Sequence, residues 1–211
     1  ADAYGHGADR LSAALAAAGC DFFAVSCVEE AAALRRSLTA AADILILGYT
    51  PPECAAALAE LNIIQTVYSE RYALSLIEAA RDAGVTVRTH IKLDTGMNRI
   101  GFAAQSPEDI RETVETIEKF SSVPEMRLDG IFTHFARADE EEASGVPEIT
   151  GSEVCAREFH AHDIQAQKHN DNETRKSEKD DVCDSSLCGY DFTARQFGRF
   201  AEVCRLLDER G

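Results

Sequence analysis

The sequence predicts an α/β fold of parallel strands joined by helices. Short apolar segments rich in β-branched residues alternate with amphipathic helical segments, which is typical of right-handed βα crossovers. A doubly wound sheet and part of a (β/α)8 barrel both show this alternation. A complete barrel needs about 250 residues, whereas 53 of the 211 residues here belong to an acidic block. We therefore expect an incomplete TIM-type (β/α)8 barrel of parallel strands with a long acidic insertion.

Five segments are predicted to be strands because apolar and β-branched residues dominate each of them. They are FFAVS (22–26), ILILG (44–48), IIQTVY (63–68), VTVRTHIKL (85–93) and MRLDGIFTHF (126–135). The opening segment ADAYG (1–5) is a candidate for the end of a sixth strand. The segments between these strands have helical periodicity, as a chain of βα units requires.

The helical segments begin and end at residues that favour helix termini. They are 9–18, 29–38, 51–61, 69–84, 106–120 and 192–211. Ser69 is a predicted N-cap, and Gly84 stops the same helix. Ser106 caps the following helix, and Pro107 lies in its first turn, where a backbone N–H is not needed.

The charge balance argues against several classes of protein. The chain has 37 acidic and 21 basic residues and a formal net charge of −16, whereas a nucleic-acid-binding protein needs a basic surface. No apolar run reaches roughly 18 residues, so we expect no transmembrane helix and no membrane partner. The first residues also lack the basic start and apolar core of a signal peptide. Seven irregularly spaced cysteines predict reduced thiols in a cytoplasmic protein.

The acidity is concentrated in residues 139–191, which carry 15 Asp or Glu against 5 Lys or Arg. Such a segment is more often a mobile insertion than part of a packed core. We therefore divide the chain into a partial (β/α) barrel at 1–138, the acidic insertion at 139–191 and a barrel helix at 192–211. The insertion contains three cysteines and three histidines: Cys155, Cys183, Cys188, His160, His162 and His169. Their spacing matches no standard zinc pattern, so a solvated insertion is preferred and no metal is expected.

The fourth predicted strand carries polar side chains on one face. By alternation, Arg88, His90, Lys92 and Asp94 face one way, and mostly apolar residues face the other. This pattern has two interpretations: a surface or edge strand, or a strand whose polar face lines the lumen of a barrel. The strand runs into DTGMNRIGF (94–102), which we expect to be a glycine-punctuated loop, and active sites of α/β proteins form at such carboxyl ends.

Two further segments carry polar groups near turns or strand ends. His134 lies at the end of a predicted strand, where a histidine is well placed for chemistry but is equally often structural. AYGHG (3–7) precedes a helix, and the first N–H groups of a helix suit a phosphate. This segment lacks the GxGxxG spacing, so alone it is a weak indication.

Three motifs occur together in a specific order and spacing. ADAYGHG at 1–7, HIKLDTGMNRIGF at 90–102 and GIFTHFARADE at 130–140 resemble the amino-terminal barrel of the alanine racemase family. The resemblance covers about residues 1–139, and 192–211 resembles the helix that follows. It implies a (β/α)8 barrel, the cofactor pyridoxal 5'-phosphate and a head-to-tail homodimer. It also implies the activity of an isomerase that interconverts L- and D-alanine for cell-wall peptidoglycan.

The resemblance further implies roles for individual residues. Tyr4 would bind the cofactor phosphate, and Arg99 would bind its phenolic oxygen near the substrate carboxylate. A guanidinium suits an oxyanion because it stays charged and offers fixed donors. Lys92 resembles a lysine that is often carbamylated and then orients this arginine. His134 would lie beside the cofactor ring and the catalytic tyrosine of the partner subunit.

The sequence also departs from the family pattern. The family's Schiff-base lysine immediately precedes the alanine that is Ala1 here, and its second base is a tyrosine of a carboxyl-terminal domain. Racemisation needs a base on each face of a planar carbanion, so we expect no catalytic residue and no activity in these 211 residues alone. Lys92 as a substitute Schiff base is the less favoured interpretation. A relative that prefers serine and a non-catalytic barrel fragment with only a phosphate or cofactor pocket remain as alternatives.

Overall fold

The computed structural model of the chain describes residues 2–39, 41–138 and 192–210, and the predicted acidic insertion at 139–191 lies outside the described residues. Its strands are β1 (Phe22–Val25), β2 (Asp43–Ile46), β3 (Ile64–Val67), β4 (Val87–Asp94), β5 (Phe102–Ala103) and β6 (Met126–Thr133). Its helical elements are η1 (Asp2–Gly5), α1 (Ala8–Ala17), α2 (Val28–Ser37), η2 (Pro52–Cys54), α3 (Ala55–Glu60), α4 (Glu70–Ala83), α5 (Pro107–Ser121) and α6 (Phe192–Arg210). The predicted alternation of strands and helices is confirmed.

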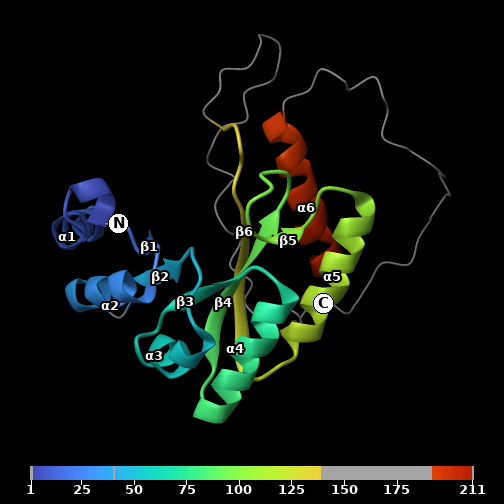
Figure 1. Cartoon of the computed structure of the whole chain (residues 1–211). Coiled ribbons are helices and arrows are strands. Elements are labelled where there is room, and N and C mark those ends of the chain that lie inside the picture. Colours follow the sequence, from blue (N-terminus) through green and yellow to red (C-terminus); the bar gives the residue numbers. More distant parts are fainter. Residues whose placement is uncertain (1, 40, 139–191, 211) are drawn as a thin grey trace, which may run out of the picture.

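The strand pairs of the described sheet are all parallel, and neighbouring strands follow one another along the chain. The order is β1-β2-β3-β4, with β6 on the second edge of β4 and the short β5 against its carboxyl end. A doubly wound sheet reverses its strand order at a switch point, and no such reversal occurs among the described strands. The fold is therefore an incomplete (β/α)8 barrel. In Figure 1, helices α2 to α5 lie beside the strands that they connect.

One face of the sheet packs against the helices and forms the hydrophobic core. Ile44, Val87, Ile91 and Leu93 are at most 2% exposed and belong to one continuous apolar cluster. Val203, with no exposed surface, joins helix α6 to the same cluster. Burial of each large apolar side chain contributes about 1.5–3 kcal/mol, so this face is the main source of stability. The opposite face of the sheet, which we name the inner face, carries the polar side chains of β4.

The helix termini agree with the predicted capping residues. Ser69 Oγ accepts the N–H of Tyr72, and Gly84 ends helix α4 with a left-handed φ of 66°. At the start of α5, Ser106 and Asp109 form a reciprocal capping box, with N–H to oxygen distances of 3.1 and 2.9 Å. Within the described ranges, no helix combines the length and apolar character needed to cross a membrane.

Three details of the structure differ from the sequence predictions. Residues 2–5 form η1 and not a strand, because Ala3 and Tyr4 have φ values of 50° and 58°, which an extended backbone does not allow. The interpretation of β4 as an edge or surface strand is wrong, since β3 and β6 pair with its two edges. The segment 94–102 was expected as a loop, but its end forms β5 through hydrogen bonds to β4.

At the amino-terminal ends of the strands, Arg88 joins several segments through one guanidinium. It donates to Asp43 on β2, to Asp129 on β6 and, at 3.3 Å, to Asn62 just before β3. The Arg88 side chain is only 17% exposed, and a charge removed from water in this way needs such partners. The polar face predicted for β4 is therefore ion-paired at this end of the strand.

Candidate functional site

Lys92 lies near the carboxyl end of β4 on the inner face. Its side chain is 5% exposed, and its Nζ donates to the Leu93 carbonyl at 2.8 Å and lies 5.5 Å from the ring centroid of Phe132. Burial is the main cause that lowers the pKa of Lys92 to about 8; Asp94 opposes this shift and Arg99 adds to it. An appreciable fraction of this amine is therefore neutral and nucleophilic at neutral pH.

The carboxylate of Asp94 organises the loop that carries Arg99. Its Oδ1 accepts the N–H groups of Gly96 and Asn98, both at 3.0 Å, and its Oδ2 accepts the N–H of Arg99 at 3.1 Å. Asn98 has a left-handed φ of 56°, a conformation that asparagine adopts more readily than most residues. Because one side chain binds three successive parts of the backbone, the loop turns tightly after β4.

Gly101 lets the end of this loop return against β4. A Cβ at this position would lie 2.6 Å from the carbonyl carbon of Leu93, 2.7 Å from the nitrogen of Asp94 and 2.9 Å from the carbonyl oxygen of Lys92. All three atoms belong to the backbone of an interior strand, and the φ of Gly101 is 137°. The position therefore requires glycine for both close approach and backbone conformation.

Lys92, Arg99 and His134 come together at the carboxyl ends of β4 and β6, and we name these three residues the basic rim. The pKa of His134 is lowered first by burial and then by the positive charges of Arg99 and Lys92. Arg99 is exposed, and its guanidinium forms no ion pair with any residue in the described part of the chain. The rim is thus a concentration of positive charge that is suited to an anion.

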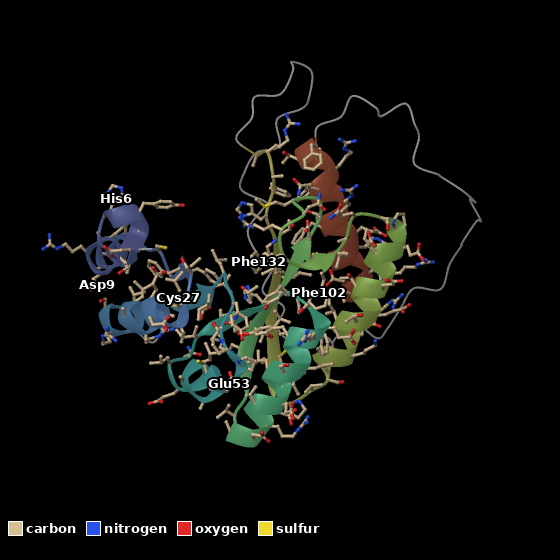
Figure 2. The ribbon with its side chains drawn as sticks, in the orientation of Figure 1. His6, Asp9, Cys27, Glu53, Phe102 and Phe132 are labelled. Atoms are coloured by element: carbon tan, nitrogen blue, oxygen red, sulfur yellow. The ribbon has the colours of Figure 1, made fainter. Side chains whose placement is uncertain are left out.

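Tyr4 lies apart from the basic rim, on η1. Its side chain is 99% exposed, and η1 lies with α1 beyond the β1 edge. Figure 2 shows this separation through neighbouring residues, since His6 lies beside α1 whereas Phe132 lies along β6. Among the described contacts, none joins Tyr4 to the basic rim. Arg99 and His134 therefore follow β4 and β6 at the same end of the sheet, and the cofactor-binding roles of Tyr4, Arg99 and His134 all stay predictions.

Aromatic rings surround His90 in the middle of the inner face. The centroid of its imidazole lies 5.8 Å from that of Phe22 and 6.5 Å from that of Phe132. A Cβ on Gly130 would lie 2.8 Å from the imidazole, so the ring occupies the space that this glycine leaves. Burial lowers the pKa of His90 to about 4, and the imidazole is neutral at pH 7. The inner face therefore has an aromatic centre between Arg88 and the basic rim.

Three residues that support the site were not predicted from the sequence: Phe132, Gly130 and Gln196. Phe132 and Gly130 lie two and four residues before His134, so alternation along β6 was a signal that could have placed them on the same face. Gln196 lies in α6 and contacts the ends of β4 and β6 through hydrogen bonds. No local pattern in the sequence points to that contact.

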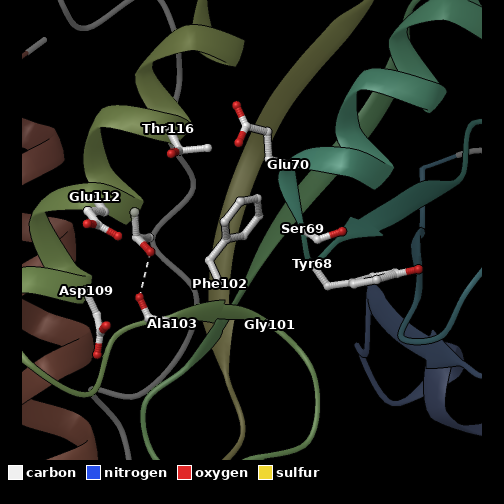
Figure 3. Close-up of a pocket in the computed structure, with 10 residues that line it drawn as sticks. Tyr68, Ser69, Glu70, Gly101, Phe102, Ala103, Asp109, Glu112 and Thr116 are labelled. Carbon is white, nitrogen blue, oxygen red and sulfur yellow. Dashed lines mark hydrogen bonds between the residues drawn. The ribbon is translucent and has the colours of Figure 1, made fainter.

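The cavity in Figure 3 lies between helices and not at the basic rim. It has a volume of about 220 Å3 and is lined by the start of α4, by β5 and by the first turns of α5. Glu70, Asp109 and Glu112 contribute carboxylates, and the Thr113 hydroxyl donates to the Ala103 carbonyl at 2.6 Å. No member of the basic rim lines this cavity. We therefore place the candidate site at the rim, where reactive and charged groups meet.

Comparison with known proteins connects this geometry to one family. A family model described as the alanine racemase N-terminal domain matches residues 1–166, which is most of the chain. The chain belongs to the alanine racemase N-terminal domain family. The resemblance inferred from the three motifs is thereby confirmed, as is the incomplete barrel. Lys92, Arg99 and His134 all lie inside the matched range.

Relatives of this alanine racemase domain are much longer than the chain. An alanine racemase of Desulfovibrio desulfuricans is 42% identical over 139 residues, which cover 66% of this chain and 36% of that protein. The structure of alanine racemase from Clostridium difficile matches with a TM-score of 0.59 and 38% identity, covering 66% of this chain and 35% of that one. Histidine racemase from Leuconostoc mesenteroides subsp. sake matches with a TM-score of 0.57 and 30% identity, covering 64% and 35%. The chain spans about a third of these relatives.

Replacement of His90 should change how stability depends on pH. The unfolded chain binds a proton on this imidazole near pH 6.5, but the folded chain binds it only near pH 4. The unfolded state therefore gains protons first, and the free energy of unfolding falls as the pH drops through this window, by about 2.5 kcal/mol between pH 7 and 4.5 for this group. In His90→Gln, urea denaturation should show a correspondingly smaller fall. His6→Gln, at an exposed site, should retain the parent's fall, and an equal fall in His90→Gln would contradict the prediction.

Substitution of Gly101 should destabilise the loop that carries Arg99. Gly101→Ala places a methyl group against the backbone of β4 and strains a positive φ, so we expect a loss of about 2–4 kcal/mol in the free energy of unfolding. Gly198→Ala is the matched control, because a Cβ there meets nothing within 4 Å and the residue lies inside helix α6. That control should gain about 0.5–1 kcal/mol. Denaturation of both variants measures the contrast, and similar stabilities would show that the loop does not need glycine at position 101.

Proposed function

We propose that this chain is the cofactor-binding barrel part of a pyridoxal-phosphate-dependent amino-acid racemase whose substrate is alanine. The observation that carries the proposal is the basic rim, in which Lys92, Arg99 and His134 lie at the carboxyl ends of β4 and β6. Barrel enzymes place their active sites at this end of the strands. Family membership supplies the reaction class, and the complete enzyme would be a cytoplasmic homodimer.

The rim suits a phosphorylated pyridine because it offers a positive charge and a neighbouring aromatic ring. An anionic group beside Arg99 would meet a guanidinium that no described side chain neutralises, and charge-assisted hydrogen bonds of this kind are strong. An aromatic ring would find Phe132, which already lies beside the Lys92 ammonium, on the same face. Tyr4 lies apart from the rim on η1, so the hydrogen bond from its hydroxyl to the phosphate that the resemblance implies stays a prediction. Arg99 and Phe132 therefore provide partners for the charged and the apolar parts of the cofactor.

The chemistry would divide between the cofactor and the rim. When bound, pyridoxal phosphate supplies an electron sink that stabilises negative charge at the α carbon of the substrate. Arg99 would hold the substrate carboxylate and the phenolic oxygen of the cofactor, because its guanidinium is planar and stays charged. His134, with its lowered pKa, is neutral at neutral pH and adds no further positive charge beside Arg99.

Lys92 would act as a positioning residue after it becomes a carbamate. Its neutral amine attacks CO2, a nitrogen–carbon bond forms and a proton is released, which leaves a carboxylate on the side chain. A pKa of about 8 makes the neutral amine more abundant at pH 7 than in an ordinary lysine, by on the order of 300-fold. The ammonium repels Arg99, whereas the carbamate would attract and orient it.

Turnover would need more than the rim. Racemisation removes a proton on one face of the α carbon and returns one on the other, so it requires two bases. The family pattern assigns these roles to a Schiff-base lysine and to a tyrosine of the second subunit, neither of which is among the residues of the rim. We therefore propose that these 211 residues bind the cofactor but do not racemise alanine on their own.

Removal of the Arg99 charge should weaken cofactor binding. We expect Arg99→Gln to lower the affinity of the purified chain for pyridoxal phosphate roughly 10- to 100-fold, because a charge-assisted bond contributes about 1.5–3 kcal/mol. Equilibrium dialysis measures the affinity. Arg111→Gln, which removes an exposed arginine from α5, is the matched control and should bind like the parent. Equal affinities of the parent and Arg99→Gln would place the cofactor site elsewhere.

Carbamylation of Lys92 should be visible by carbon NMR. In 13C-labelled bicarbonate the parent should show a carbamate signal that grows as the pH rises from 7 to 9, because deprotonation near the lowered pKa of about 8 frees the amine. Lys92→Gln should lose the signal. Lys119→Gln, which removes a lysine that is 63% exposed on α5, should keep it. A signal that survives in Lys92→Gln, or one that never forms in the parent, would contradict the proposed role.

A further inference from the structure

Gln196 of helix α6 is completely buried and forms hydrogen bonds with two other segments. Its Nε2 donates to Thr95 Oγ1 at 3.3 Å and to the carbonyl of His134 at 3.4 Å. Its Oε1 accepts the N–H of Ala136 at 2.9 Å. One amide group therefore contacts the loop after β4 and the backbone on both sides of residue 135 after β6. A buried amide with this many partners specifies their relative position.

The same amide starts a directional chain of hydrogen bonds. Thr133 Oγ1 donates to the carbonyl of Leu93 at 3.1 Å, so the 2.9 Å contact between the two threonine hydroxyls has Thr95 as its donor. The chain then runs from Gln196 Nε2 to Thr95, to Thr133 and to the β4 backbone. Arg199, one turn along α6, donates from Nη1 to the Thr95 carbonyl at 2.7 Å. Helix α6 thus holds both the side chain and the backbone of Thr95.

This network lies where the pairing of the sheet has ended. The register of β4 and β6 runs only as far as Leu93 and Thr133. Arg99 lies in the loop between β4 and β5, and His134 follows the last paired residue of β6, so the pairing of β4 with β6 does not directly fix their separation. Gln196 contacts both segments and supplies a connection that the sheet lacks.

Helix α6 is also packed too closely on the loop to shift freely. A Cβ on Gly96 would lie 3.2 Å from Arg199 Nη1, 3.2 Å from the Phe192 ring and 3.5 Å from Gln196 Cγ. Gly96 therefore lets the helix approach the backbone of the loop directly. The close packing makes the position of the Gln196 amide well defined, which a positioning residue requires.

We propose that Gln196 is a positioning residue that sets the separation of Arg99 and His134, and hence the width of the basic rim. The inference rests on the proposed function only where it connects the width of the rim with cofactor binding and catalysis. The geometric claim concerns the chain without its cofactor. Loss of the amide would leave the strands paired but would let the segment of His134 move away from the cations of the rim.

The titration of His134 by proton NMR, with no cofactor present, tests this proposal. In Gln196→Met, which keeps the shape of the side chain without its hydrogen bonds, the pKa of His134 should rise, because the imidazole moves away from Arg99 and Lys92 and gains water. We expect its proton affinity to increase at least about threefold. Arg205→Gln, on the exposed surface of the same helix, should leave the titration unchanged. His134→Gln assigns the resonance.

Two variants of Thr95 provide a second test, which applies even if Gln196→Met does not fold. Thr95→Val removes the hydroxyl from the hydrogen-bond chain and should shift His134 in the same direction, whereas Thr95→Ser retains the hydroxyl and should titrate like the parent. An unchanged His134 pKa in folded Gln196→Met, or in Thr95→Val, would overturn the proposal. The titration of His134 does not involve the cofactor. The proposed function is tested separately, by equilibrium dialysis of Arg99→Gln, so the two proposals can fail independently.

Discussion

Strand β4 is hydrogen-bonded along both edges, and this constraint decides where the polar groups of the site lie. An interior strand of such a sheet has one face against the helices and one against the interior of the barrel. The apolar face of β4 joins the hydrophobic core, so Arg88, His90 and Lys92 point to the inner face. The register with β6 then places Gly130 beside His90 and Phe132 beside Lys92. The site therefore follows from the alternation of one strand and the register of its neighbour.

Each polar side chain of β4 avoids the penalty of burial in a different way. Arg88 keeps its charge and is paired with Asp43 and Asp129 on the flanking strands. His90 lies among aromatic rings and loses its charge, with a pKa lowered to about 4. Lys92 is intermediate, since its pKa of about 8 leaves both forms populated near neutral pH. Along β4 the side chains are thus, in order, a charged guanidinium, a neutral imidazole and a titratable amine. Of these three groups, only the amine suits covalent chemistry.

The features that could be predicted from the sequence are those that depend on residues close together in the chain. Apolar and β-branched residues located the long strands, alternation placed Lys92 on the polar face of β4, and His134 was noted at the end of a strand. The resemblance of three motifs, not periodicity, pointed to Arg99 and supplied the roles of all three residues. Strand β5 could not be predicted because two residues carry no periodicity and are defined only by their bonds to β4. Gln196 could not be predicted because its partner Thr95 lies 101 positions away, and only the packing of α6 brings them together. The contribution of Tyr4 stays a prediction.

The positive charges of Arg99 and of protonated Lys92 explain why an anion would bind at the basic rim. Arg99 lowers the pKa of both Lys92 and His134, which means that the charged forms of these groups oppose one another in the folded chain. An anion placed beside Arg99 and a protonated Lys92 would interact favourably with both charges, whereas burial is the larger cause of the two lowered pKa values. A carbamate on Lys92 would supply such an anion from within the chain and neutralise part of the rim. The charge that remains on Arg99 would then be directed at a single acceptor, and the position of that acceptor would depend on how α6 holds the loop.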